Sequence, residues 1–155
     1  MQQETANGTG YGAEAGTSGP DERLAALDRL VGTWRVSGGA EGTVVYHWMP
    51  GGFFLLQDVD LEQGGTRVRG LEVIGRERPF GAEAPSEDIR SRFYDELGNT
   101  FDYVYDVTGD TLTIWAGEPG SPAFFRGEFD AAGDVCTGAW TYPGGGGYAS
   151  VMTRA

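Results

Sequence analysis

Short apolar runs and polar turn clusters alternate along most of this chain. The runs are rich in Val, Ile, Phe, Tyr and Trp, and a Gly-, Pro-, Asn- or Asp-rich cluster follows about every 8–12 residues, as in sandwiches and barrels. They predict ten strands, at residues 33–38, 43–49, 53–61, 67–75, 89–94, 100–107, 111–116, 123–129, 135–141 and 148–154. Because most connections are short, neighbouring strands can pair in sequence order, which favours an antiparallel meander closed on itself. One longer polar connection, residues 76–88, is expected to be mobile.

The chain divides into a short N-terminal segment and one domain. Residues 1–19 are small, polar and aperiodic, which predicts a disordered N-terminal arm, and residues 20–155 form the predicted domain. Within 21–31, helical spacing places four apolar residues on one face: Leu24, Leu27, Leu30 and Val31. Gly32 ends this short amphipathic helix. The fold class expected is therefore all-β, with about ten strands and a short N-terminal helix.

The segment 89–107 predicts a hairpin whose register can be worked out. If Tyr94 faces Thr100, the other pairs are Arg92 with Asp102, Phe93 with Phe101, Ser91 with Tyr103, and Ile89 with Tyr105. One face is then aromatic and the other carries opposite charges, as cross-strand pairing favours. The same parity continues through Gly109-Asp110, where Val107 meets Leu112 and Tyr105 meets Ile114. We expect the aromatic face to line the barrel interior.

The run Phe53-Phe54-Leu55-Leu56 directly follows the turn Pro50-Gly51-Gly52. Alternation places Phe53 and Leu55 inside together with Gln57, and places Phe54 and Leu56 outside beside Asp58 and Asp60. The outer apolar pair needs a cover, and the helix has the only spare apolar stripe. An aggregation-prone edge is the alternative.

The orientation of His47 depends on the length of this turn. A three-residue loop pairs Met49 with Phe53 and sends His47 inward. A two-residue loop pairs Pro50 with Phe53, which sends Tyr46 and Trp48 inward and His47 out. Both remain open, and an inward His47 would suit acid–base chemistry.

Charge and composition exclude some classes of binding partner. The 155 residues hold 11 Arg, no Lys and 23 Asp and Glu, for a formal net charge of −12. So acidic a surface argues against nucleic acid and anionic membranes, which need a basic footprint. No apolar run approaches the ~18 residues that span a bilayer, and no signal peptide is recognisable, so we expect a cytoplasmic location. The single cysteine, Cys136, is expected in the core.

Several motifs are typical of one fold family. The helix followed by "GTW" at 32–34 and the closing "MTR" at 152–154 resemble the two ends of a calycin-type barrel. The segments "YHWMPGGFFLLQDVD", "GLEVIG", "GDTLTIWAGEPGSPA" and "GGGGYASVMTR" resemble the bacterial DUF1579 family of uncharacterised lipocalin-like proteins. The resemblance implies a lipocalin-like or fatty-acid-binding-protein-like barrel with a cavity for a small hydrophobic molecule. It also implies that Trp34 packs under Arg154, and cation–π stacking supports that pairing independently.

Metals and cofactors are not expected. A zinc site needs three or four ligands, and His47 and Cys136 are the only histidine and cysteine. Haem is the cofactor that a resemblance to nitrobindin-like barrels would suggest, and those proteins hold it through a histidine of the later strands. This chain has no histidine after residue 47, which argues against haem. No strained Gly-x-Ser-x-Gly turn accompanies His47, which argues against a Ser-His-Asp arrangement.

The function expected is the binding of a small, largely apolar molecule inside the barrel. The candidate ligand-binding residues are Phe53, Leu55, Gln57, Ser91, Phe93, Phe101, Tyr103 and Tyr105. The alternative is an enzyme that uses the same cavity to cyclise or isomerise a small hydrophobic substrate of polyketide or terpenoid type, mainly by orienting it. Its candidate catalytic residues are His47, Tyr103 and Tyr105. A barrel filled by its own aromatic rings is the third possibility.

Overall fold

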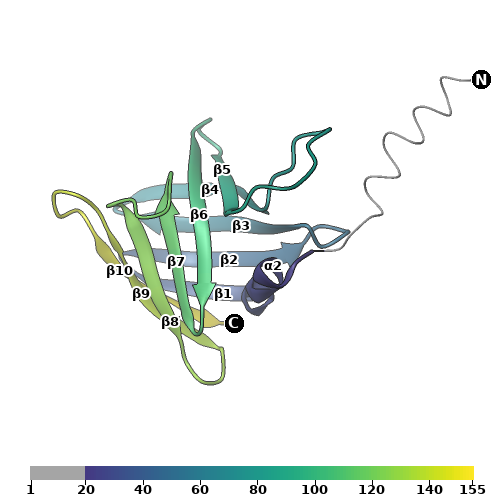
Figure 1. Ribbon diagram of the computed structural model, residues 1–155. Coiled ribbons are helices and arrows are strands. Elements are labelled where there is room, and N and C mark those ends of the chain that lie inside the picture. Colours follow the sequence, from purple (N-terminus) through teal and green to yellow (C-terminus); the bar gives the residue numbers. More distant parts are fainter. Residues whose placement is uncertain (1–19) are drawn as a thin grey trace, which may run out of the picture.

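Ten antiparallel strands and one short helix make up the computed structural model, which describes residues 20–155 (Figure 1). The predicted disordered arm, residues 1–19, lies outside the described residues. The strands are β1 Gly32–Gly38, β2 Ala40–Trp48, β3 Phe54–Gln63, β4 Thr66–Gly75, β5 Ile89–Asp95, β6 Thr100–Thr108, β7 Thr111–Ala116, β8 Phe124–Phe129, β9 Val135–Thr141 and β10 Tyr148–Arg154. All ten predicted strands are confirmed, with bounds shifted by three residues or fewer.

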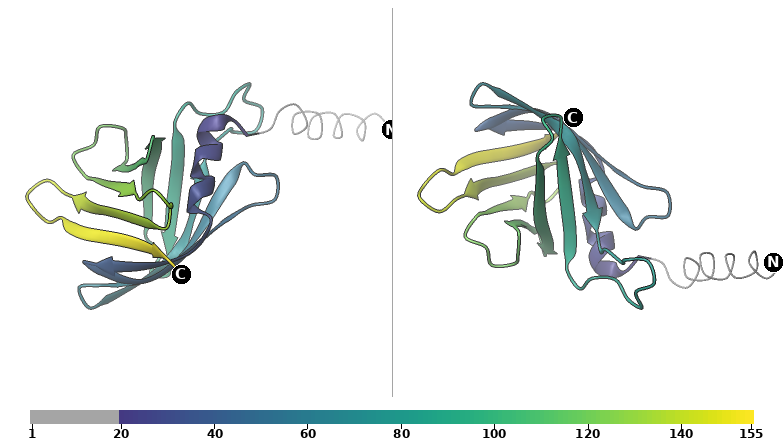
Figure 2. Two further views of the ribbon diagram at one scale, coloured as in Figure 1. Left: turned by 90° about the horizontal axis from the view of Figure 1, so that it is seen from below. Right: turned by 90° about the horizontal axis from the view of Figure 1, so that it is seen from above.

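Each strand pairs with its neighbours in sequence, and β1 pairs with β10 to close the sheet into a barrel (Figures 1 and 2). The structure is therefore an all-β, closed antiparallel barrel, and it agrees with the calycin-like fold expected from the sequence. The predicted register of β5 with β6 is confirmed pair by pair, from Tyr94 opposite Thr100 to Ile89 opposite Tyr105. The continuation into β7 is confirmed as well, with Tyr105 opposite Ile114.

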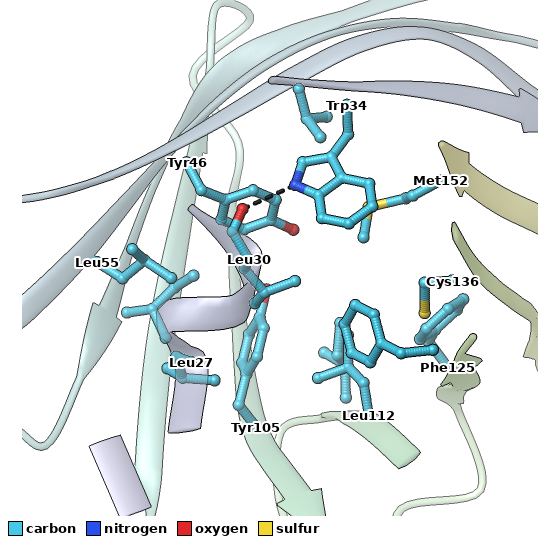
Figure 3. Packing of buried hydrophobic residues seen from close by; sticks show 14 of the residues in the cluster. Leu27, Leu30, Trp34, Tyr46, Leu55, Tyr105, Leu112, Phe125, Cys136 and Met152 are labelled. Carbon is cyan, nitrogen blue, oxygen red and sulfur yellow. Dashed lines mark hydrogen bonds between the residues drawn. The ribbon is translucent and has the colours of Figure 1, made fainter. Parts of the chain in front are cut away.

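The helix before β1 closes one end of the barrel. It begins as one α-helical turn, α2 Glu22–Ala25, and continues as a 3₁₀ helix, η1 Ala26–Leu30. The side chain of Asp21 accepts a hydrogen bond from the Leu24 amide, which caps the start. Leu27 and Leu30 are fully buried, and Figure 3 shows them among the inward side chains of the barrel. Hydrophobic burial thus holds a helix too short to be stable alone.

The position of this helix corrects one expectation. Its leucines pack on the inner side of β3, in the same core cluster as Leu55. The outer residues Phe54 and Leu56 are only half-buried, so the helix is not their cover. The ring of Phe54 instead lies over Gly75, where a Cβ atom would come within 2.6 Å of it. The apolar stripe of the helix is buried in the barrel interior, where Leu27 and Leu30 have no exposed surface.

The barrel is closed by a contact between its first and last strands. Trp34 is fully buried and lies opposite Arg154 in the register. The Arg154 guanidinium stacks 4.2 Å from the centroid of the indole ring. The indole Nε1 donates to the Leu30 carbonyl at 2.7 Å, and Figure 3 shows this hydrogen bond. Arg154 also donates to the carbonyls of Val31 and Arg29. The predicted pairing is confirmed, and it ties the helix to both ends of the sheet.

The turn between β2 and β3 resolves the orientation of His47. The Met49 amide donates to the Phe54 carbonyl, and Gly51 and Gly52 adopt φ values of 100° and 78° that disfavour other residues. His47 then lies opposite Leu56 on the outer face, the register of the two-residue alternative. Phe53 precedes β3 and is 40% exposed, so the expectation that it lines the interior is wrong. The turn takes Phe53 out of the strand before the alternation begins.

The long connection between β4 and β5 is tied to the rest of the molecule. Arg76 donates to the Ser86 carbonyl across the loop and forms an ion pair with Asp21 before the helix. Ser86 also accepts from the Glu77 amide. These contacts place the loop beside the helix-closed end. In the described part of the chain, no helix is long and apolar enough to cross a membrane.

Candidate ligand-binding cavity

A cavity of about 380 Å³ occupies the barrel interior beyond the helix. It extends to the barrel end opposite the helix, where the side chains of Phe101, Tyr142 and Tyr148 lie. Most of its wall is apolar or aromatic. The lining residues are Val36, Val44, Tyr46, Gln57, Val59, Leu61, Gln63, Val68, Glu72, Phe93, Asp95, Phe101, Tyr103, Tyr105, Leu112, Ile114, Phe125, Trp140, Tyr142, Tyr148, Ser150 and Met152.

The residues predicted to bind a ligand divide into three groups. Five of them line the cavity: Gln57, Phe93, Phe101, Tyr103 and Tyr105. Leu55 and Ser91 are buried just behind the lining, Leu55 in the core cluster with the helix leucines and Ser91 against Glu72. Phe53 and His47 lie outside the barrel. The His47 side chain is 51% exposed and faces Asp58 at 3.9 Å, which removes it from the catalytic candidates.

The polar centre of the cavity is Glu72, a residue that the sequence did not single out. It is only 4% exposed, and its carboxylate accepts hydrogen bonds from three side chains. Gln57 donates to Oε1 at 2.5 Å, Ser91 donates to Oε2 at 2.5 Å, and the Tyr105 hydroxyl lies 3.0 and 2.9 Å from the two oxygens. These donors come from β3, β5 and β6, on both sides of β4. They form one polar cluster, Gln57–Glu72–Ser91–Tyr105.

Burial and hydrogen bonding act on Glu72 in opposite directions. Removal from water raises the pKa of the carboxyl to about 6, although the bonds from Ser91, Tyr105 and Gln57 favour the ionised form. All three partners are neutral donors, and no arginine or histidine side chain lines the cavity among residues 20–155. When Glu72 ionises, its charge is therefore solvated by hydrogen bonds without an opposite charge.

Three tyrosines around Glu72 keep their protons through the neutral range. Burial, with the nearby Glu72 charge adding to it, raises the pKa of Tyr46, Tyr103 and Tyr105 above the ordinary value. Neutral phenols can donate to a carboxylate or to a ligand oxygen. The cavity therefore offers several hydroxyl donors and one titratable carboxyl at its deep end.

The wall near the open end is built from neighbouring aromatic rings, some tilted and some stacked against each other. Trp140 lies 5.9 Å from Tyr103, 5.6 Å from Phe125 and 5.9 Å from Tyr142, between ring centroids. Phe93 and Phe101 stack at 6.1 Å on the other side, as predicted from the hairpin register. Such rings provide a flat apolar surface at low cost in side-chain entropy.

Hydrophobic alternation concealed Glu72 in the sequence. In "GLEVIG", Leu71 and Val73 flank the glutamate, so an apolar-inside pattern would turn Glu72 to solvent. The structure does the opposite, and Leu71 is exposed. A signal was present in the turn at Gln63-Gly64-Gly65. Its register places Glu72 opposite Gln57, the polar residue already expected inside.

Two other kinds of reactive site would be a metal centre and a nucleophilic cysteine. Within the described residues, no group of three or more His, Cys, Asp or Glu side chains could hold a metal ion. Cys136 is buried in the core cluster, as expected, and burial raises the pKa of its thiol to about 11. A protonated, buried thiol is a poor nucleophile.

A scan against protein-family models finds no match to this chain, and a search of curated proteins finds no relative. The fold and the cavity define a calycin-like barrel with an internal pocket. The resemblance to the DUF1579 family stays a prediction, as does the cytoplasmic location.

Proposed function

We propose that this protein binds a small, largely apolar molecule inside the barrel. The observation that carries the proposal is the cavity of about 380 Å³, whose apolar wall surrounds one polar cluster at its deep end. Ligand sites of proteins are typically clefts of about 300–1,000 Å³, mostly apolar, with a few polar groups that fix orientation. The aromatic rings at the open end would cover the apolar body of the ligand. Gln57, Glu72 and Tyr105 would orient its polar group.

Two glycines on the barrel wall help to leave space for a ligand in the interior. The glycine pair Gly127 and Gly138 faces the interior between β8 and β9, and a Cβ atom at either would come within 2.7 Å of the Phe125 ring. These glycines let the ring lie flat on the sheet instead of crossing the barrel. Space remains in front of it, next to Tyr103 and Trp140.

A fluorescent apolar alcohol, naphthylmethanol, tests the proposal. Titration should show saturable binding to the wild-type protein. Val59→Trp places a large ring on the lining and should abolish binding, whereas Asp58→Trp places the same ring on the outer face of β3 and should leave it intact. Equal binding by both variants, with circular dichroism showing that both are folded, would place the probe on the surface and refute the proposal.

An enzyme is the second candidate, and Glu72 is the observation that favours it. A general base works best with a pKa near the operating pH, and burial raises the Glu72 pKa to about 6. The carboxylate could take a proton from a carbon next to a carbonyl group and return it to another carbon. The Tyr105 or Tyr103 hydroxyl would donate to the carbonyl oxygen as negative charge develops there. This isomerisation needs no further reactant.

The enzyme candidate has its own test. Small enones with a migratable double bond, incubated in deuterium oxide, should gain deuterium at the carbon that receives the proton. Glu72→Gln should abolish this exchange, while Tyr105→Phe should reduce it by about 100-fold, within the range known for acid–base groups. No exchange above the buffer rate with any of these substrates would leave binding as the function.

A further inference from the structure

We propose that the ligand carries a protonated amine, so that its ammonium group lies against the Glu72 carboxylate and its apolar body lies among the aromatic rings. This inference rests on the proposed binding function and names the chemical class of the ligand. Three features of the protein support it: the uncompensated charge of Glu72, the position of the protein's own cations away from the cavity, and the acidic and aromatic route into the cavity.

The first feature is the uncompensated charge of Glu72. Its partners Gln57, Ser91 and Tyr105 are uncharged donors. Burial of a carboxylate without a cation costs free energy that hydrogen bonds recover only in part. A cation brought by the ligand would supply the missing opposite charge, and in a site sheltered from water their attraction is stronger than at a surface.

The second feature is the distribution of cations in the protein. Of the residues described, all 11 arginines and His47 lie off the cavity wall. Arg92 pairs with Asp102 and Arg67 with Asp60 on the outer face, while Arg154 closes the end with the helix. A fatty acid or other anionic ligand would therefore find a carboxylate and no counter-charge. The cavity is built to reject the anions that the fatty-acid-binding-protein-like shape suggests.

The third feature is the route into the cavity. Asp95 lines the mouth as a second carboxylate, and hydrogen bonds from Asn99 lower its pKa, so it stays ionised. Phe101, Tyr142 and Tyr148 surround the same end, and the faces of aromatic rings attract ammonium groups. The formal net charge of −12 draws cations toward the molecule as a whole. Both the route into the cavity and the site at Glu72 therefore favour a positively charged ligand.

A matched series of three naphthyl compounds tests the inference: naphthylmethylamine, naphthylmethanol and naphthoate, which are a cation, a neutral molecule and an anion on the same ring system. Calorimetric titration near neutral pH should give an affinity for the amine about tenfold or more above that for the alcohol, and for naphthoate about tenfold or more below it. Glu72→Gln should remove the preference for the amine, so that this variant binds the amine no more tightly than the alcohol. Asp102→Asn, which removes the same charge from the outer face, should keep the preference.

The pH dependence gives a second measurement. The titratable groups that face Glu72 or share its cavity are Tyr46, Tyr103, Tyr105, Tyr142, Tyr148 and Asp95. The tyrosines remain protonated and Asp95 remains ionised near neutral pH, because burial raises the tyrosine pKa values and hydrogen bonds lower that of Asp95. The amine also keeps its proton, so among the groups that line the cavity only Glu72 titrates near pH 6. Amine affinity should fall as the pH is lowered through about 6, and alcohol affinity should not.

The outcomes separate the two levels of the proposal. If none of the three compounds binds, the proposed binding function fails, and this inference with it. If the alcohol binds and the amine binds no better, or if Glu72→Gln keeps the preference for the amine, the cation inference is wrong and the binding function stands.

Discussion

Glu72 sets the chemistry of this protein at the scale of single residues. It is a buried glutamate in a mostly apolar barrel, and its three hydrogen-bond donors come from strands on both sides of β4. A group with this degree of burial and this many partners is rigid, so it can hold the polar end of a ligand in a fixed place. Burial of its charged form also lowers the free energy of unfolding, and a stability measurement can detect this effect.

We predict that Glu72 makes folding stability fall as pH rises. Its pKa is about 4.5 in the unfolded chain and about 6 in the folded protein. The stabilisation is fully present below the unfolded value and is lost through the folded value, a change of about 2 kcal/mol. Urea denaturation of wild type and Glu72→Gln should therefore show the variant gaining relative stability across this interval. A difference that does not change with pH would mean that Glu72 titrates normally.

A second prediction concerns His47, which lies on the outer face of β2. His47→Ala should leave probe binding and any exchange activity unchanged within about threefold, because exposed substitutions away from a site are nearly neutral. Titration of naphthylmethanol with this variant measures the effect. Loss of binding on this substitution would show that the β2–β3 register differs from the one observed.

At the scale of elements, the strands and their register follow from local rules that the sequence displays. Alternation and glycine-rich turns fix each hairpin, as Arg92 opposite Asp102 illustrates. The apolar spacing predicts the helix, but it does not predict the 3₁₀ segment or the position inside the barrel, because both depend on the shape of the barrel end. The sequence does not predict a buried Glu72, because a buried carboxylate contradicts the hydrophobic pattern and its hydrogen-bond donors lie on other strands.

The charged pair on the β5–β6 hairpin gives a prediction at this scale. Arg92 and Asp102 are joined at 2.7 Å, yet both side chains are more than half exposed. Exposed pairs of this kind contribute only about 0–1 kcal/mol. Arg92→Asp combined with Asp102→Arg should therefore fold with a stability within about 1 kcal/mol of wild type. Thermal unfolding of the double variant and both single variants measures this, and a large loss in the double variant would mean that the register depends on the orientation of the pair.

At the scale of the whole molecule, closure of the barrel depends on Trp34. Trp34→Ala removes a fully buried ring that stacks under Arg154 and bonds to Leu30, and it should cost about 3–5 kcal/mol. Trp34→Phe keeps a ring but leaves the Leu30 carbonyl without its donor, so it should cost less. Chemical denaturation compares the two. A cost for Trp34→Ala below about 1 kcal/mol would show that the contact between β1 and β10 does not depend on this ring.

The cavity is the property of the whole molecule on which function depends. Ten strands leave a space that the side chains on its wall do not fill, and the helix closes only one end of it. The most direct test is a crystal structure of the protein soaked with naphthylmethylamine. The ring should lie inside the barrel next to Trp140 and Tyr103, with the amine nitrogen within hydrogen-bond distance of the Glu72 carboxylate. An empty or collapsed interior, with the compound absent or bound to the outer surface, would contradict ligand binding in the barrel.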